Sequence, residues 1–294
     1  MIAAVEKACC VETPLFFEHK GSRLFAMLYE PPNDTALGGR CGMVFCAPFA
    51  EEATISQKVC VDFLRHLAER GFVTLRFDYR GFGDSEGSFR DLTPSTMVED
   101  IHGAMAHLRR HRVERIGLCG LRFGATLAAI VAGAQPEVDF LLLWEPVVDM
   151  QGYLKNFLRA QVIATNSLAG RPVETRANLI TKLNRGEPVD ILGYPLSPSC
   201  AEEIEEIDVL TRAEGYHGPA LVASIGRSKR RRQELKGLIK LYENQTHPFK
   251  LMEVEGTPFW VDPNNPWQEM DFLQGHETLF VYTADWLETV LSHS

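Results

Sequence analysis

The feature that most constrains the fold is a strand that runs into a helix through two closely spaced glycines. The run Arg115–Cys119 predicts a buried strand, and Arg122–Ala134 predicts a helix that follows it directly. Gly120 and Gly124 bracket the junction, and residues without a Cβ atom let a strand and the next helix approach each other across a strained turn. This junction predicts an α/β sheet and places residue 122 at the apex of the turn.

The rest of the chain repeats the alternation of strands and helices. Helical periodicity predicts helices at Ile55–Arg70, Thr96–His111, Gln233–Asn244 and His276–Leu291. Strands are predicted at Leu15–His19, Arg23–Tyr29, Met43–Ala47, Phe72–Asp78, Val138–Trp144, Pro219–Ile225 and Phe249–Val254. Because strands that alternate with helices pair in parallel, we expect a mostly parallel central sheet with helices on both faces, opened by an antiparallel pair.

The segment from residue 146 to residue 218 has a different pattern. Helical pieces there are interrupted by glycines and prolines such as Gly170, Pro172 and Gly186, and no strand is expected. We therefore expect a helical cap inserted into the sheet domain. The predicted core comprises residues 1–146 and 219–294, and the predicted cap comprises residues 147–218.

Composition restricts the class of protein. A formal net charge of −9 over 294 residues argues against a nucleic-acid binder, which usually has a basic excess. The seven cysteines are odd in number and include no Cys-x-x-Cys pair, so we expect reduced thiols and no metal site. The segment Gly81-Phe-Gly83 lacks the third glycine of a dinucleotide-binding loop, so no cofactor is expected.

The sequence also bears on location. Its first residues lack the basic and apolar regions of a signal peptide, and its longest apolar runs are too short to span a bilayer. We therefore expect a cytoplasmic protein without a membrane span. The sequence leaves open whether the protein forms a homodimer.

Two further loops favour one α/β architecture. Residues 77–87 read Phe-Asp-Tyr-Arg-Gly-Phe-Gly-Asp-Ser-Glu-Gly and follow a predicted strand, where α/β-hydrolases carry an Asp-x-Arg-Gly-x-Gly-x-Ser turn. The segment Ala47–Glu52 follows an earlier strand, where this fold places half of its oxyanion hole. The junction at Arg122 has the context of a nucleophile elbow. The three loops occur in the right order, so the sequence predicts the α/β-hydrolase fold.

The residue at the elbow argues against serine-hydrolase chemistry. That position is normally Ser, Cys or Asp, whereas Arg122 stays protonated and can only donate hydrogen bonds. The position of the triad acid falls in Gly226–Arg232, which contains no carboxylate, and that of the histidine falls in Gly256–Trp260, which contains no histidine. We therefore expect none of the three triad positions to do triad work.

Several segments that span nearly the whole chain carry a family resemblance: Ala47–Glu52, Gly83–Gly87, Gly120–Gly124, Leu143–Val148, Gly193–Ser197 and Pro258–Trp260. Through them the chain resembles the exosortase A system-associated hydrolases, particularly their second type, within the serine-aminopeptidase-like α/β-hydrolases. The resemblance implies a hydrolase label without a defined substrate and a link to export or polysaccharide gene clusters. It also implies that an arginine at the elbow belongs to the pattern of this subgroup.

Arg122 is the main candidate for function. With backbone N–H groups at Phe123 and near Phe49, its guanidinium would form a pocket for a carboxylate or phosphate. The alternative is an internal salt bridge to Glu145 or to the loop residues Glu51 and Glu52, because a buried arginine needs a counter-charge. The two interpretations are compatible. The remaining candidates for ligand contact are Ala50, Leu121, Arg227 and Trp260.

Three hypotheses about function follow. The first is a non-hydrolytic protein that binds an acidic small-molecule, peptide or glycan-linked ligand under the cap. The second is a hydrolase or lyase of the ester, thioester or amide class that uses acid–base chemistry from Glu145, Glu52 or His276, although His276 also fits a surface residue at a helix start. The third is an interaction scaffold with a vestigial pocket. Because Arg and Glu side chains converge on one predicted site, the first two are favoured.

Overall fold

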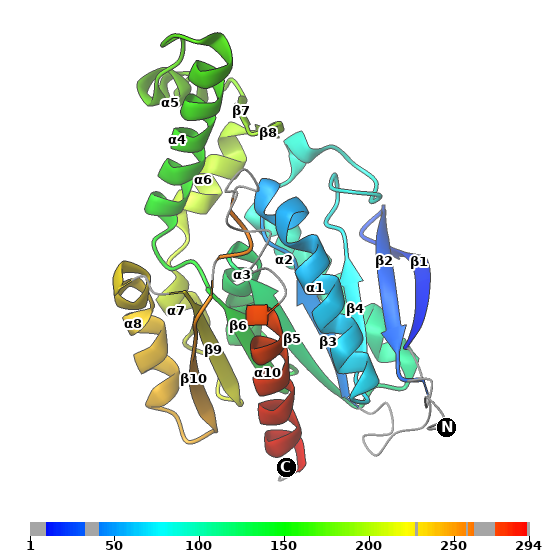
Figure 1. The fold of residues 1–294 in the computed structure, drawn as a ribbon. Helices are drawn as coiled ribbons and strands as arrows, with labels where there is room; N and C mark the ends of the chain where they lie inside the picture. Colours follow the sequence, from blue (N-terminus) through cyan, green and yellow to red (C-terminus); the bar gives the residue numbers. More distant parts are fainter. Residues whose placement is uncertain (1–9, 33–40, 227–228, 257, 262–273, 293–294) are drawn as a thin grey trace, which may run out of the picture.

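The computed structural model describes residues 10–32, 41–226, 229–256, 258–261 and 274–292. Its centre is an eight-stranded sheet in the order β1-β2-β4-β3-β5-β6-β9-β10 (Figure 1). The first three strands in this order pair antiparallel and all later neighbours pair parallel. The strands are β1 (Val11–His19), β2 (Ser22–Glu30), β3 (Cys41–Cys46), β4 (Val73–Phe77), β5 (Arg115–Leu121), β6 (Phe140–Trp144), β9 (Ala220–Ile225) and β10 (Phe249–Val254). The predicted mostly parallel sheet, opened by an antiparallel pair, is confirmed.

Helices cover both faces of the sheet (Figure 1). On one face, α1 (Glu51–Glu69) and α10 (Gln274–Ser292) share a buried apolar cluster with every second residue of the strands. On the other face lie α2 (Pro94–Leu108), α3 (Phe123–Ala134) and α8 (Lys229–Glu243), which share a second cluster. Two short 3₁₀ helices, η1 (Phe89–Asp91) and η2 (Arg109–His111), flank α2, which is capped by the side chain of Thr93. Among the described residues, none of the helices combines the length and the apolar character needed to cross a bilayer.

Most of the chain between β6 and β9 lies over the carboxyl ends of the parallel strands. This part comprises α4 (Met150–Ala169), α5 (Arg176–Asn184), β7 (Val189–Ile191), β8 (Tyr194–Leu196) and α6 (Pro198–Glu206). The last helix of the segment, α7 (Val209–Ala213), packs instead against the end of α3 near Gly133. Figure 1 shows α4 and α5 projecting beyond the sheet.

The expectation that this segment contains no strand is wrong, because β7 and β8 form a small antiparallel hairpin. Its strands are too short to show a period, and β8 contains a proline. The turn between them has positive φ at both Leu192 and Gly193, a combination that Asn-Gly usually signals in a sequence and Leu-Gly does not.

Candidate functional site

Arg122 lies at the apex of the turn between β5 and α3. Its φ of 55° and ψ of −122° form a conformation that residues with a Cβ atom rarely adopt. Its backbone N–H donates a hydrogen bond to the carbonyl of Trp144 over 2.9 Å, which ties the turn to β6. A Cβ atom on Gly124 would overlap the carbonyl oxygens of Cys46 and Ala47, so only glycine lets α3 pack against the loop after β3. The predicted sharp, glycine-dependent turn is confirmed.

The loop after β3 faces this turn. Ala50 has a φ of 52°, and α1 begins directly after it at Glu51 rather than at the predicted Ile55. No side chain caps this helix start, which explains why the sequence did not reveal it. Consequently Glu51 and Glu52 lie in the first turn of a helix and not in a loop. The ring centroids of Phe49 and Phe123 are 5.9 Å apart. The two backbone segments that were predicted to supply N–H donors to an anion are therefore neighbours.

The side chain of Arg122 pairs with Glu52. Its Nε atom lies 3.2 Å from Oε1 of Glu52, and the hydroxyl of Tyr153 on α4 donates a hydrogen bond of 2.7 Å to Oε2 of the same carboxylate. Glu52 is 8% exposed and Tyr153 is 4% exposed, whereas the side chain of Arg122 is 16% exposed. Among the carboxylates that the sequence left open as partners, Glu52 is therefore the one in the salt bridge.

Burial dominates the electrostatics of the cluster. Desolvation raises the pKa of Glu52, although Arg122 and the Tyr153 hydroxyl oppose that shift. Burial by itself would lower the pKa of Arg122, but the charge and hydrogen bond of Glu52, together with Tyr153 and Glu145, outweigh burial and raise the pKa of the guanidinium. Burial, together with Glu52, also raises the pKa of Tyr153 well above its usual range, so the phenol stays a donor. The attraction between the two charges thus does not fully offset the cost of burying the carboxylate.

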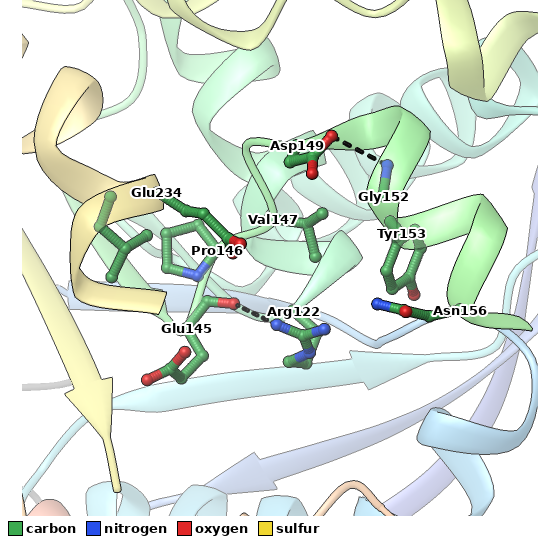
Figure 2. A pocket seen from close by; sticks show the side chains of 10 residues that line it. Arg122, Glu145, Pro146, Val147, Asp149, Gly152, Tyr153, Asn156 and Glu234 are labelled. Carbon is green, nitrogen blue, oxygen red and sulfur yellow. Dashed lines mark hydrogen bonds between the residues drawn. The ribbon is translucent and has the colours of Figure 1, made fainter. Parts of the chain in front are cut away.

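Glu145 uses its carboxylate elsewhere. With a φ of 45°, it turns Oε1 toward β9, where it accepts hydrogen bonds from the backbone N–H of Ile225 and, over 3.1 Å, from the hydroxyl of Ser224. Only its backbone carbonyl accepts a hydrogen bond from Arg122, from Nη1 over 3.4 Å (Figure 2). Glu145 therefore holds the guanidinium in place through its main chain.

Arg122 also lines a cavity of about 200 Å³ between the sheet and α4. Figure 2 shows its guanidinium facing this cavity, with Glu145 on one side and Tyr153 and Asn156 on the other. Arg122 donates hydrogen bonds from Nε and Nη1, and among the described residues Nη2 has no acceptor. The guanidinium also lies over the rings of Tyr153 and Trp260, at 5.7 and 5.3 Å from their centroids. The site thus contains a fixed guanidinium whose Nη2 group can still donate hydrogen bonds to a ligand.

The other predicted residues are distributed as follows. Leu121 ends β5 and is buried beneath the turn, and Trp260 lies beside Arg122. His276 packs edge-on against Phe259 at 4.6 Å and lines a different depression between α1 and α10. Arg227 lies outside the described residues. The structure therefore brings together Arg122, Glu52 and Trp260 but leaves His276 out of the Arg122 cavity.

Tyr153 and Asn156 were missed by sequence reasoning. Both lie in the first turns of α4, directly after the loop that follows β6. Their helix could be expected over the sheet edge from its place in the chain. Which of its side chains point to Arg122 depends on how α4 crosses that edge, which no local pattern encodes.

Comparison with known proteins extends these observations. Residues 42–186 match the family described as serine aminopeptidase, S33. An uncharacterized 31.7 kDa protein of Escherichia coli is 28% identical over 131 residues, which is 42% of this chain and 46% of that protein. Polyketide transferase af380 of Aspergillus fumigatus is 32% identical over 85 residues, which is 28% of this chain and 29% of that protein. The chain thus matches less than half the length of these curated relatives.

Solved structures resemble nearly the whole chain. Est1E from Butyrivibrio proteoclasticus, with bound ferulic acid, is 18% identical with a TM-score of 0.67, covering 95% of this chain and 99% of that chain. The alpha/beta hydrolase GrgF from a Penicillium species is 17% identical with a TM-score of 0.64, covering 96% and 99%. Proline iminopeptidase of Mycobacterium smegmatis is 15% identical with a TM-score of 0.62, covering 96% and 100%. These likenesses confirm the predicted α/β-hydrolase fold, a mostly parallel central sheet with helices on both faces.

Proposed function

We propose that the protein binds the acidic group of a small-molecule, peptide or glycan-linked ligand at Arg122 and is not a standard serine hydrolase. The observation that carries this proposal is the guanidinium at the elbow apex, which lines a cavity and has an Nη2 group without a recorded acceptor among the described residues. A carboxylate or phosphate in that cavity would accept two N–H groups of Arg122 in a bidentate geometry.

The cluster is kept at an energetic cost. Desolvation raises the pKa of Glu52 in spite of Arg122, so the buried pair is not one that maximises stability. The strained backbone at Arg122 adds a further cost of about 1–3 kcal/mol. Such costs are commonly found where a protein keeps a site prepared for a ligand.

The elbow supplies more than the guanidinium. The first N–H groups of α1 and α3 lack acceptors within their own helices, and both helices begin beside the site. Their positive ends favour an anion. Glu52 would neutralise the charge of Arg122 while no ligand is bound. An acidic ligand would then either replace Glu52 at the guanidinium or bind beside it.

The wider assignment is part of the same proposal. Residues 147–218 would act as the cap over a core of residues 1–146 and 219–294, and the replaced triad positions would leave no nucleophile and base. The resemblance to the exosortase A system-associated hydrolases supports a ligand from an export or polysaccharide pathway. The Arg122 cavity, closed on one side by α4, supports a ligand held partly beneath the cap.

A labelling experiment and a binding experiment test the proposal. We expect a fluorophosphonate probe to leave the protein unlabelled, and stoichiometric labelling would overturn the proposal. In ligand-observed NMR we expect acetate, benzoate or inorganic phosphate to bind the wild-type protein and not Arg122→Ala. Arg110→Ala, which removes an exposed arginine elsewhere, is the matched control. An unchanged Tm in Arg122→Ala would support the anion site, whereas a large fall together with unchanged anion binding would favour a structural salt bridge.

A second candidate function is an acid–base hydrolase or lyase centred on Glu52. The raised pKa of Glu52 supports it, because burial shifts the carboxyl in the direction that general acid–base catalysis requires. His276 contributes little to this candidate because it lines another depression. Hydrolysis of p-nitrophenyl acetate that is lost in Glu52→Gln, with a pH profile that follows one carboxyl, would favour this function over binding alone.

A further inference from the structure

Exposed apolar side chains concentrate at the far end of the cap. Ten large hydrophobic side chains of the described residues are exposed, and four of them fall between residues 163 and 180. Leu168 is 91% exposed and Ile163 is 55% exposed, and Val173 and Ile180 complete the group. Monomeric proteins rarely leave aliphatic side chains clustered in water, so this concentration indicates an interaction surface.

The same region carries the opposite charge to the chain as a whole. Residues 159–185, here named the cap tip, contain five basic residues and one acidic residue, a formal charge of +4, whereas the whole chain has a net charge of −9. Lys182 forms a salt bridge of 2.8 Å with Glu174, the acidic residue. The four arginines of the cap tip are all exposed: Arg159, Arg171, Arg176 and Arg185. The charge of the cap tip therefore favours an anionic partner.

The shape of the cap tip restricts the partner further. Figure 1 shows that the ends of α4 and α5 and the loop between them project away from the sheet. An open depression at the end of α4 is lined by Ile163 and Arg171, among others. Along the chain, the four exposed aliphatic residues of the cap tip are interspersed with its four exposed arginines, so apolar and positively charged groups share this surface. A flat or deformable anionic surface fits such a protrusion better than a folded partner does.

We propose that the cap tip docks on the surface of an anionic lipid bilayer. The arginines would contact lipid phosphates, and Leu168, Ile163 and Val173 would enter the boundary between headgroups and acyl chains. Basic residues and apolar residues contribute separately to such binding, since charge attracts the protein to the surface and apolar burial retains it there. The interaction is peripheral and does not depend on the anion site at Arg122.

Vesicle flotation of the full chain tests the proposal. We expect binding to vesicles of phosphatidylcholine mixed with phosphatidylglycerol, weak binding to phosphatidylcholine alone, and loss of binding as salt is raised. Each basic residue near an anionic surface is worth about fivefold in partitioning, so Arg171→Gln with Arg176→Gln should weaken it by about 25-fold. Leu168→Asp with Ile163→Asp should reduce binding at least tenfold. All of these positions are exposed, so we expect the variants to fold, and circular dichroism checks that they do.

Matched controls distinguish binding through the cap tip from nonspecific binding of exposed apolar residues to vesicles. Val281→Asp with Tyr282→Asp changes two apolar residues on α10 that are 39% and 57% exposed, and this variant should bind vesicles as the wild type does. Arg122→Ala should also bind vesicles normally, so failure of the ligand-binding proposal and failure of this one are distinguishable. The proposal would be overturned if the wild type bound equally to vesicles with and without phosphatidylglycerol. It would also be overturned if neither the double arginine variant nor the double aspartate variant of the cap tip reduced binding. A concentration-dependent dimer that Leu168→Asp abolishes would overturn it as well, since the tip would then contact a second copy of the chain.

Discussion

Two features of the local structure make arginine an unfavourable residue at position 122. Its backbone conformation is one that glycine would adopt more easily, and its positive charge lies at the start of a helix, where the macrodipole favours an anion. Glu52 offsets the second effect from the first turn of α1, and Tyr153 fixes the carboxylate by donating to its other oxygen. The residue is therefore held by tertiary contacts and not by its own preference.

The pair should contribute little to stability. Because burial of Glu52 is not fully offset by Arg122, we expect the double variant Arg122→Met with Glu52→Gln to be as stable as the wild type or more stable, by about 1–4 kcal/mol. Urea unfolding measures the difference, and anion binding should be lost at the same time. The single variants complete a thermodynamic cycle. A double variant that is less stable by several kcal/mol would show that the pair is structural.

The raised pKa of Glu52 also predicts a pH dependence. The folded state holds this proton more tightly than the unfolded state, so the free energy of unfolding should fall as pH rises from 4.5, the ordinary pKa of this group, through the folded-state pKa. Glu52→Gln removes this contribution. We expect the stability of the wild type, measured against that of Glu52→Gln, to decline across this window and to be constant above it. Urea unfolding at a series of pH values measures it, and an increase with pH would contradict the assigned direction.

The sequence predicted the position of Arg122 but not its environment. Two glycines and a strand-to-helix junction were sufficient to place it at a turn apex, because that geometry is local. The choice of partner depended on backbone conformation at a distance: the positive φ of Glu145 turns its carboxylate to β9, and the early start of α1 brings Glu52 over the site. Tyr153 could not be predicted because it reaches the site from another layer.

At the scale of elements, apolar period and glycine position were enough for the sheet and its main helices. Two predictions at this scale were wrong because the local sequence carries no signal. The strands β7 and β8 are too short to show an apolar period, and α1 starts without a capping side chain. Each element is defined by contacts with another part of the chain. The hydroxyl of Tyr194 on β8, for example, lies 2.7 Å from that of Thr54 on α1.

The junction between β5 and α3 should tolerate no side chain at Gly124. An added Cβ would overlap backbone oxygens of the loop after β3, and a backbone cannot move aside as a flexible side chain can. We expect Gly124→Ala to lower the free energy of unfolding by about 3 kcal/mol. Gly170→Ala is the control, because an added Cβ there meets no atom within 4 Å and only the positive φ costs about 1 kcal/mol. Equal losses in the two variants would contradict the close approach.

At the scale of the whole molecule, the segment 147–218 and the sheet share one apolar cluster. Residues of α4, α5 and α6 belong to the same buried group as residues of β3, β5 and α3. The ring of Phe157 on α4 meets that of Phe49, from the loop after β3, at 5.9 Å. Because they share this cluster, the segment 147–218 and the sheet should unfold together.

Phe157→Ala tests this coupling, because all four tryptophans of the chain lie outside residues 147–218 and report only on the remainder. We expect the variant to lose about 3 kcal/mol and to shift the urea midpoint of tryptophan fluorescence as much as that of circular dichroism. Ile163→Ala, at the exposed cap tip, should leave both midpoints unchanged. If Phe157→Ala moved the circular dichroism and left the fluorescence midpoint in place, the cap would unfold independently. A ligand at Arg122 could then be admitted by unfolding of the cap alone, without any opening of the sheet.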